Sequence, residues 1–257
     1  MAMILRPFIP GIMLSLPLYA AAASPWVVTD GSTLQVTSDY SSVEQNDVPL
    51  VVSGAGSQLT TNSGLTFTTS HAGTRGARVT EHGAIEVSGG VLKADGLTIT
   101  SPVAGIEVYA HEGVYGNATL NNIHFTLTGD KAIQAIFARR GHVTGTNITI
   151  DTASEYFSAI EIGNGTNSTL ILNDSTINAA YVGIRTLGGH ATLNNVDITT
   201  TVNDNNHAHN ALEISGQGDS ATINGGTFQT SKVYSHGIYM PLSSTILDAT
   251  GVNILTH

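Results

Sequence analysis

The chain has 257 residues, of which 41% are hydrophobic and 11% are charged, and its formal net charge is −10. The low charged fraction, together with 33 Thr and 28 Gly, indicates strands and turns rather than helices. The excess of acidic residues removes the electrostatic basis for binding nucleic acid or an anionic membrane surface. The absence of Cys excludes disulfides, thiolate metal sites and a Cys nucleophile.

Residues 1–23 are predicted to form a secretory signal peptide. Arg6 precedes an apolar run from Phe8 to Tyr19, and residues 20–24 then read Ala-Ala-Ala-Ala-Ser. This order of positive charge, apolar segment and small residues is typical of an export signal, and we expect cleavage between Ala22 and Ser24. The apolar run is too short and too interrupted by Pro to favour a transmembrane anchor.

The rest of the chain repeats a short pattern of small, aliphatic, variable and aliphatic residues. Its first aliphatic residues are spaced 27, 27, 24, 28 and 26 residues apart, at Ile106, Ile133, Ile160, Ile184, Leu212 and Ile238. An earlier copy is expected at Gly76–Val79. A second apolar position also recurs about every 27 residues, at Phe67, Ile99, Phe125, Ile150, Ile177, Ile198, Phe228 and Ile254. A period of this length is typical of a solenoid.

Each period holds about three short runs of alternating apolar and polar residues, separated by Gly, Asn or Asp. Strands of this kind can stack coil upon coil, with aliphatic residues inside and polar residues outside. We therefore predict an all-β fold, a parallel β-helix of about eight coils. Residues 24–58 are expected to form an N-terminal cap with the first irregular strands, and residues 59–257 the helical repeats. A sandwich of β-hairpins is the competing prediction, but it does not explain the regular return of the same turn residues.

A recurring Asn at one turn is expected to have a structural role. The residues concerned are Asn121, Asn147, Asn173, Asn194 and Asn224. Stacked Asn side chains can bond to their equivalents in the next coil, and Asn tolerates a left-handed backbone.

The outward-facing position of the repeated pattern is expected to form a ladder of its own. Its predicted members are Arg78, Glu107, Gln134, Glu161, Arg185, Glu213 and Tyr239. Glu161, Arg185 and Glu213 would then form a stack of alternating charge, which as an exposed ion-pair ladder adds little stability. Alternatively, Glu161 and Glu213 could serve as paired carboxylates for glycoside hydrolysis, because two coils would separate them.

Other groups of reactive residues favour catalysis or metal binding only weakly. The segment Gly218-Asp219-Ser220-Ala221 partly matches serine-hydrolase motifs, but the sequence offers no activating base and orienting acid for Ser220. His82, His111, His142 and His190 follow the first strand of their coils, where the alternatives are exposed turns or a stacked metal or pH-sensing site. The Asp residues are too scattered to predict a calcium cluster. We therefore assign no catalytic, cofactor-binding or metal-ligating residue.

The polar stretch Thr200–Asn210, which contains His207 and His209, is expected to bulge from its coil as a loop. Because loops carry function more often than the scaffold does, this stretch is the first place to expect partner contacts.

The repeats Ala118-Thr-Leu-Asn-Asn-Ile and Ala191-Thr-Leu-Asn-Asn-Val, with the export signal and the absence of Cys, resemble the passenger domain of bacterial autotransporters, the pertactin-like group in particular. The resemblance covers about residues 24–257. It implies a single-stranded, right-handed parallel β-helix of the pectin-lyase-like type, exposed on a Gram-negative cell surface or secreted. It also implies adhesion or host interaction, with a host-cell surface protein or glycan as partner.

Members of this family end in a translocator barrel, whereas this sequence stops within the repeat pattern at His257. We therefore expect a fragment or truncated product with an open coil end, which reaches the outer membrane only through a barrel absent from this chain and otherwise stays in the periplasm. The leading prediction is a non-enzymatic passenger without cofactors. The alternatives are a secreted polysaccharide lyase or glycosidase of the same fold, and a truncated autotransporter product without function.

Overall fold

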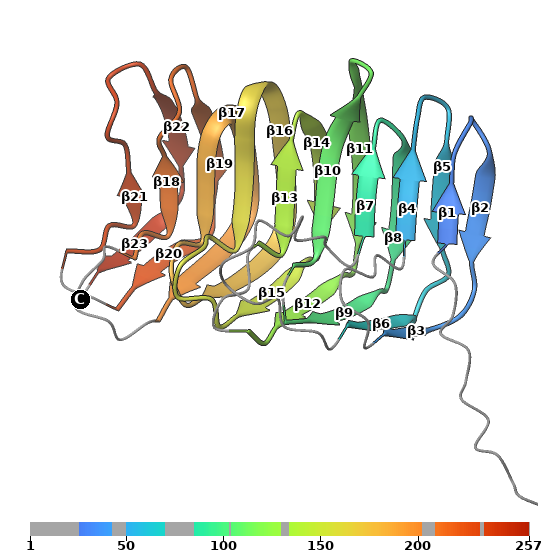
Figure 1. The fold of residues 1–257 in the computed structure, drawn as a ribbon. Helices are drawn as coiled ribbons and strands as arrows, with labels where there is room; N and C mark the ends of the chain where they lie inside the picture. The colour runs from blue at the N-terminus through green and yellow to red at the C-terminus, as the bar shows by residue number, and fades with distance from the viewer. Residues whose placement is uncertain are drawn as a thin grey trace, which may run out of the picture.

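The computed structural model describes residues 26–42, 50–69, 85–102, 104–129, 134–201, 209–231 and 234–256. The predicted signal peptide lies outside these residues. The described chain winds into stacked coils, and three parallel sheets run along the length of the rod (Figure 1). The prediction of an all-β parallel β-helix is therefore confirmed.

Each coil contributes one strand to each sheet, and strands pair with their equivalents in the adjacent coils. The first sheet contains β1 (Trp26–Val28), β4 (Leu50–Ser53), β7 (Ile85–Ser88), β10 (Ile106–His111), β13 (Ile136–Arg139), the starts of β16 (Ile160–Ala179) and β17 (Ile184–Thr200), β18 (Leu212–Ile214) and β21 (Ile238–Tyr239). The second contains β2 (Thr33–Val36), β5 (Gln58–Thr61), β8 (Val91–Asp95), β11 (Val114–Asn121), β14 (Gly141–Thr146), the middles of β16 and β17, β19 (Ser220–Asn224) and β22 (Ile246–Thr250). The third contains β3 (Tyr40–Ser42), β6 (Thr66–Thr69), β9 (Thr98–Ser101), β12 (His124–Leu127), β15 (Thr149–Thr152), the ends of β16 and β17, β20 (Thr227–Thr230) and β23 (Asn253–Thr256).

The first and second sheets meet at a hairpin between β10 and β11. Here the pairing is antiparallel, with Ala110 opposite Tyr115 and His111 opposite Val114. Glu112 and Gly113 form the tip and both have positive φ, 49° and 82°. Two left-handed residues give the turn whose twist suits a two-residue hairpin. The hairpin extends the edge where these two sheets meet (Figure 1).

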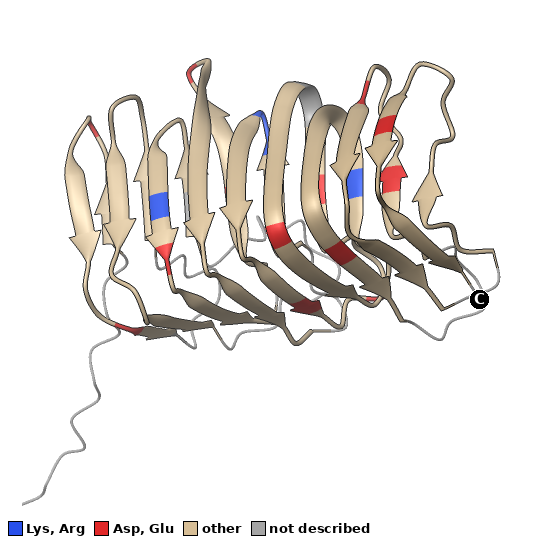
Figure 2. Ribbon diagram, turned by 180° about the vertical axis from the view of Figure 1, so that it is seen from behind, with Lys and Arg blue, Asp and Glu red and all other residues tan. Residues whose placement is uncertain are grey.

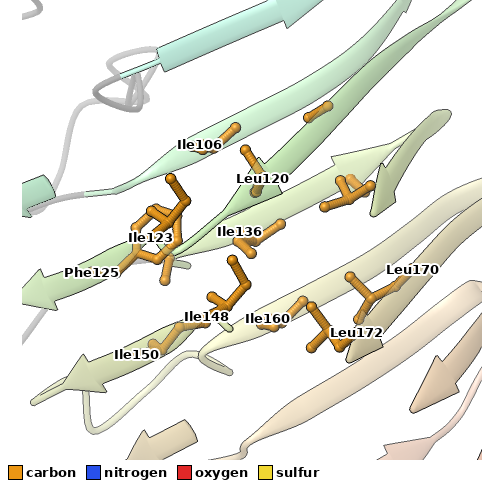
Figure 3. Close-up of a cluster of buried hydrophobic side chains, with 14 of the residues drawn as sticks. Ile106, Leu120, Ile123, Phe125, Ile136, Ile148, Ile150, Ile160, Leu170 and Leu172 are labelled. Atoms are coloured by element: carbon orange, nitrogen blue, oxygen red, sulfur yellow. The ribbon is translucent and has the colours of Figure 1, made fainter. Parts of the chain in front are cut away.

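The core consists of apolar side chains stacked from coil to coil. The predicted third-sheet row from Phe67 to Ile254 is confirmed, because each of its members pairs with the next. Phe67, Phe125 and Phe228 are fully buried. Figure 3 shows this packing around Phe125, where aliphatic side chains from all three sheets meet.

The predicted position of one first-sheet strand was wrong by three residues. Ile106 pairs with Ile136, and Ile136 pairs with Ile160, so Ile136 holds the place expected for Ile133. Ile133 itself lies outside the described residues. The run Ala132–Ala138 contains two overlapping copies of the repeat pattern, with Gln134 and Phe137 at the outward position. The pattern favours the first copy, because its outward residue is polar.

Two other expectations concern the N-terminal part of the helix. The segment Gly76–Val79 lies outside the described residues, and the ladder position expected for it is held by β7, since Ile85 pairs with both Leu50 and Ile106. Strands β1 to β3 already pair in register with the next coil. Residue 59 therefore marks no change of architecture among the described residues.

None of the described residues forms a helix long and apolar enough to cross a membrane.

Candidate functional site

The turn between the second and third sheets carries two adjacent ladders of Asn side chains. In the first, Asn194 Nδ2 donates to Asn173 Oδ1 at 2.7 Å and Asn224 Nδ2 donates to Asn194 Oδ1 at 2.8 Å. In the second, Asn147 Nδ2 donates to Asn122 Oδ1 at 2.8 Å. Residues of this second ladder have positive φ, namely Gly96, Asn122, Asn147, Asp174, Asn195, Gly225 and Gly251. The predicted coil-to-coil bonding is confirmed for Asn147, Asn173, Asn194 and Asn224, whereas for Asn121 the structure gives only its place in the first ladder by register. Asn147 belongs to the second ladder, and Thr146 takes its place in the first.

The outward row of the first sheet differs from the predicted one at two places. Its members by register are Glu86, Glu107, Phe137, Glu161, Arg185, Glu213 and Tyr239. Phe137 stands where Gln134 was expected, and Glu86 stands where Arg78 was expected. Gln134 nevertheless reaches the row from the preceding turn, because its Nε2 donates to Glu161 Oε2 at 3.1 Å.

Glu161, Arg185 and Glu213 form the predicted stack of alternating charge. Arg185 Nη2 lies 3.3 Å from Glu213 Oε2, and the side chains are 21% and 15% exposed. Burial would lower the pKa of Arg185, but the Glu213 carboxylate raises it above its ordinary value. Burial raises the pKa of the Glu161 carboxyl, although the positive charge of Arg185 and the Gln134 hydrogen bond act in the opposite direction.

The separation and the surroundings of Glu161 and Glu213 can be compared with those of the carboxylate pair that hydrolyses a glycoside. Two strand spacings, about 9 to 10 Å, separate Glu161 from Glu213, which is at the upper end of the range for an inverting pair. A raised pKa suits a general acid. Arg185, however, occupies the coil between the two carboxylates and is paired with one of them. The guanidinium therefore takes the space in which a sugar and an attacking water would have to lie.

Ser220 has a histidine partner that the sequence did not indicate. His190 Nδ1 lies 2.8 Å from Ser220 Oγ, because the two residues pair across adjacent coils. His142 Nδ1 lies at the same distance from Thr169 Oγ1 in the same row, so the contact repeats as a ladder. Both carboxylate oxygens of Asp219 accept backbone N–H groups, from Gly189 and Gly216. Among the described residues, no carboxylate is bonded to the other ring nitrogen of His190, as a catalytic triad would require.

The other predicted histidines do not come together. His142 and His190 share a row with Thr169 between them, His111 lies in the hairpin, and His82 and His207 lie outside the described residues. The described chain contains no group of three His, Cys, Asp or Glu residues arranged for a metal ion. Within the predicted loop, His209 is buried, and its ring packs edge-on against Tyr181 at 5.4 Å.

A shallow hollow of about 450 Å³ lies along one edge of the third sheet. Most of its lining residues are of polar type, but apolar atoms make up the larger part of its surface. The lining consists of Thr126, Leu127, Thr128, Asp151, Thr152, Ala153, Asn178 and Thr201. Asp151 accepts a hydrogen bond from Asn178 Nδ2 at 2.8 Å and lies 3.0 Å from His124 Nε2. These polar groups satisfy one another across three coils, so they form a hydrogen-bonding surface rather than a reactive centre.

Sequence reasoning missed a group of aromatic and Arg side chains beside the hairpin. Tyr109 and Phe137 pack edge to face with ring centroids 6.4 Å apart, and the Arg139 guanidinium lies 4.8 Å from the Phe137 centroid. Across the corner, Tyr115 stacks on His142 at 5.1 Å. The available signal was Phe137, an aromatic residue at an outward position that is charged in the adjacent coils, at Glu107 and Glu161.

Comparison of the chain with protein-family models, curated proteins and solved structures gave no match.

Proposed function

We propose that the chain is an exported, non-enzymatic β-helix of the autotransporter-passenger type. It binds a host-cell surface protein or glycan through the outward faces of its coils. The observation that supports this most is the length of these faces: one row of the second sheet passes through Thr60, Lys93, Thr119, Thr144, Ile171, Thr192 and Thr222. Where Thr residues are adjacent in this row, as at Thr119 and Thr144, hydroxyl groups lie about 4.8 Å apart, and Lys93 and Ile171 interrupt them.

The chemistry of the described side chains favours binding over catalysis. The carboxylate pair that best fits hydrolysis has Arg185 between its members, and the Ser220–His190 contact recurs as His142–Thr169. Both contacts join equivalent positions of adjacent coils, as the Asn hydrogen bonds do, which favours a structural role. A rod of this kind suits extended contact with a surface, because its faces are long and its coils are held by pairing on both sides.

A secreted polysaccharide-active enzyme is the second candidate. It is favoured by the raised pKa of Glu161, two coils from Glu213. Incubation of the protein with a panel of plant and bacterial polysaccharides, followed by assay of reducing ends and unsaturated uronates, tests this candidate. Product formation that is lost in Glu161→Gln would replace the binding proposal with catalysis.

The binding proposal is tested by producing the full chain in a Gram-negative host. N-terminal sequencing of the exported protein is expected to begin at Ala23 or Ser24, and labelled protein is expected to bind cultured animal cells saturably. An intact N-terminus in the cytoplasm would contradict export. Binding no greater than that of an unrelated protein of equal net charge would contradict the adhesive role.

A further inference from the structure

The corner beside the hairpin combines aromatic rings with exposed positive charge. We call the group Tyr109, Tyr115, Phe137, Arg139 and Arg140 the aromatic–arginine corner. Tyr109 pairs with Arg139 in adjacent first-sheet strands, and Arg140 forms the turn into β14. Both Arg side chains are exposed, whereas the three rings are half-buried. The rings are therefore fixed in place, and the guanidinium groups remain accessible to a ligand.

Arg140 occupies a backbone position that suits glycine. Register places it in one column with Gly89, Tyr115, Asn167, Gly188 and Gly218, and all of these except Tyr115 have positive φ. Arg140 has φ of 58°, and its N–H donates to Ser168 Oγ at 2.8 Å. A left-handed conformation is strained for a residue with a side chain, and Asn adopts it more readily than Arg does. Residues that break such a local rule are concentrated at functional sites.

Positive charge is scarce on this molecule, which makes its position informative. The whole chain has 9 Lys and Arg against 19 Asp and Glu. Among the described residues the positive side chains are Lys93, Arg139, Arg140 and Arg185, and Figure 2 shows how few they are along the rod. Arg185 is paired with Glu213, whereas no described carboxylate forms an ion pair with Arg140. Two adjacent Arg residues at one corner thus give this acidic rod a local site for an anion.

We propose that the aromatic–arginine corner binds an acidic polysaccharide, with Arg139 and Arg140 on its carboxylate or sulfate groups and the rings against its sugar faces. This inference rests on the proposed binding function and names its site and ligand class. Guanidinium groups pair with carboxylates in a bidentate manner. The negative face of an aromatic ring attracts the C–H groups on one side of a sugar ring. The Glu161 carboxylate in the adjacent coil interacts electrostatically with Arg139, so Arg140 is the more available of the two guanidinium groups. At physiological salt, acidic side chains more than about 8 Å away are largely screened.

The surroundings of the corner favour a sugar chain over an acidic peptide. The second-sheet face that begins there presents Asn117, Thr119 and Thr144, which are exposed amide and hydroxyl groups in adjacent coils. These groups both donate and accept hydrogen bonds, as the many hydroxyls of a glycan require. An extended peptide would instead need an unpaired strand edge for its backbone, and β11 and β14 are paired on both sides.

The test measures binding of the full chain to immobilised heparin, polygalacturonate, neutral dextran and polyglutamate. Arg140→Gly removes the charge and suits the left-handed backbone, so it should weaken binding to the acidic glycans about tenfold, the effect of losing one charge-assisted hydrogen bond. Its Tm should stay equal or rise. Lys232→Gln is the charge-matched control, because it removes one positive charge from the sequence between β20 and β21, outside the corner and its glycan face, and should leave binding within about twofold.

Comparison of heparin with polygalacturonate shows whether sulfate or carboxylate is the preferred anion. Equal losses in Arg140→Gly and Lys232→Gln would overturn the proposal in favour of a general charge effect. Binding to polyglutamate as tight as to the glycans would overturn it in favour of an acidic protein partner. A chain that binds cells but neither acidic glycan would refute this inference and leave the proposed function standing, whereas a chain that binds nothing would refute both.

Discussion

Glu161 shows how one half-buried carboxylate can make stability depend on pH. Its pKa is raised above the ordinary value of 4.5 for a Glu carboxyl, mainly by burial. Between the unfolded and the folded pKa, the folded protein therefore binds more protons than the unfolded chain. The stability that Glu161 contributes is present below 4.5 and is lost as the pH rises through the folded pKa.

Glu161→Gln is accordingly expected to unfold at a higher urea concentration than the parent at pH 7, because the cost of a buried charge is removed. The difference should vanish well below pH 4.5, where the parent carboxyl is protonated. Urea unfolding at several pH values checks this. The control is Glu155→Gln at an exposed site. A gain for Glu161→Gln that is the same at every pH would show that packing, not charge, is responsible.

Arg185 lies between two carboxylates in the outward row of the first sheet. Arg185→Leu keeps most of the apolar contact but leaves Glu161 and Glu213 facing one another without a positive charge between them. Loss of a hydrogen bond between charged groups predicts a decrease of about 1.5 to 3 kcal/mol in the free energy of unfolding. The double change Arg185→Leu with Glu213→Leu should recover part of that loss, since no unpaired charge then remains at Glu213. Chemical denaturation of all three variants tests the coupling.

At the scale of the strand and its turns, the left-handed Asn positions allow backbone strain to be separated from hydrogen bonding. Asn147 has φ of 55° and donates to Asn122. Asn147→Gly and Asn147→Ala both lose this hydrogen bond, but only Ala is strained there. We expect the Ala variant to be about 1 kcal/mol less stable than the Gly variant. Equal stabilities in thermal unfolding would contradict a left-handed backbone at this turn.

The small residue that opens each copy of the repeat has a steric role. A Cβ on Gly183 would overlap the side chain of Ile198 and the carbonyl oxygen of Ala211. Gly183→Ala is therefore expected to lower the free energy of unfolding by about 1 to 3 kcal/mol, as overpacking does. Ala159→Gly, at the equivalent position of the preceding coil, removes atoms without overlap and serves as the control. Denaturant unfolding in which both variants lose equally would contradict the steric explanation.

The sequence predicts the third-sheet row in full but not the whole of the first-sheet row, for a physical reason. Each strand of the third sheet follows the Asn turn after a constant interval, as Phe125 follows Asn122 and Ile150 follows Asn147, so the turn residues locate this row even where the spacing between coils varies. The connection before each first-sheet strand varies, and 30 residues separate Ile106 from Ile136 whereas 24 separate Ile136 from Ile160. Side-chain neighbours such as His190 and Ser220, 30 residues apart, depend on these irregular intervals. Periodicity alone could not find them, or the aromatic–arginine corner.

At the scale of the whole molecule, stability should vary along the rod. Each interior strand pairs with a coil on both sides, as β15 does with β12 and β16. Among the described residues, β23 pairs on one side with β20, and its Ile254 and Leu255 are 48% and 47% exposed. In a solenoid each coil contacts its neighbours alone, so opening can begin at an end without unfolding the middle.

Hydrogen exchange should therefore follow a gradient, with the amides of Thr149–Thr152 the slowest and those of Asn253–Thr256 among the fastest. Phe125→Ala, which removes a fully buried ring, should cost about 3 to 5 kcal/mol and accelerate exchange in β9, β12 and β15. Exchange in β23 should change little, because its local opening already requires less free energy than opening the middle coils. Uniform acceleration along the whole chain would contradict nearest-neighbour coupling and show instead that the coils unfold as one cooperative unit.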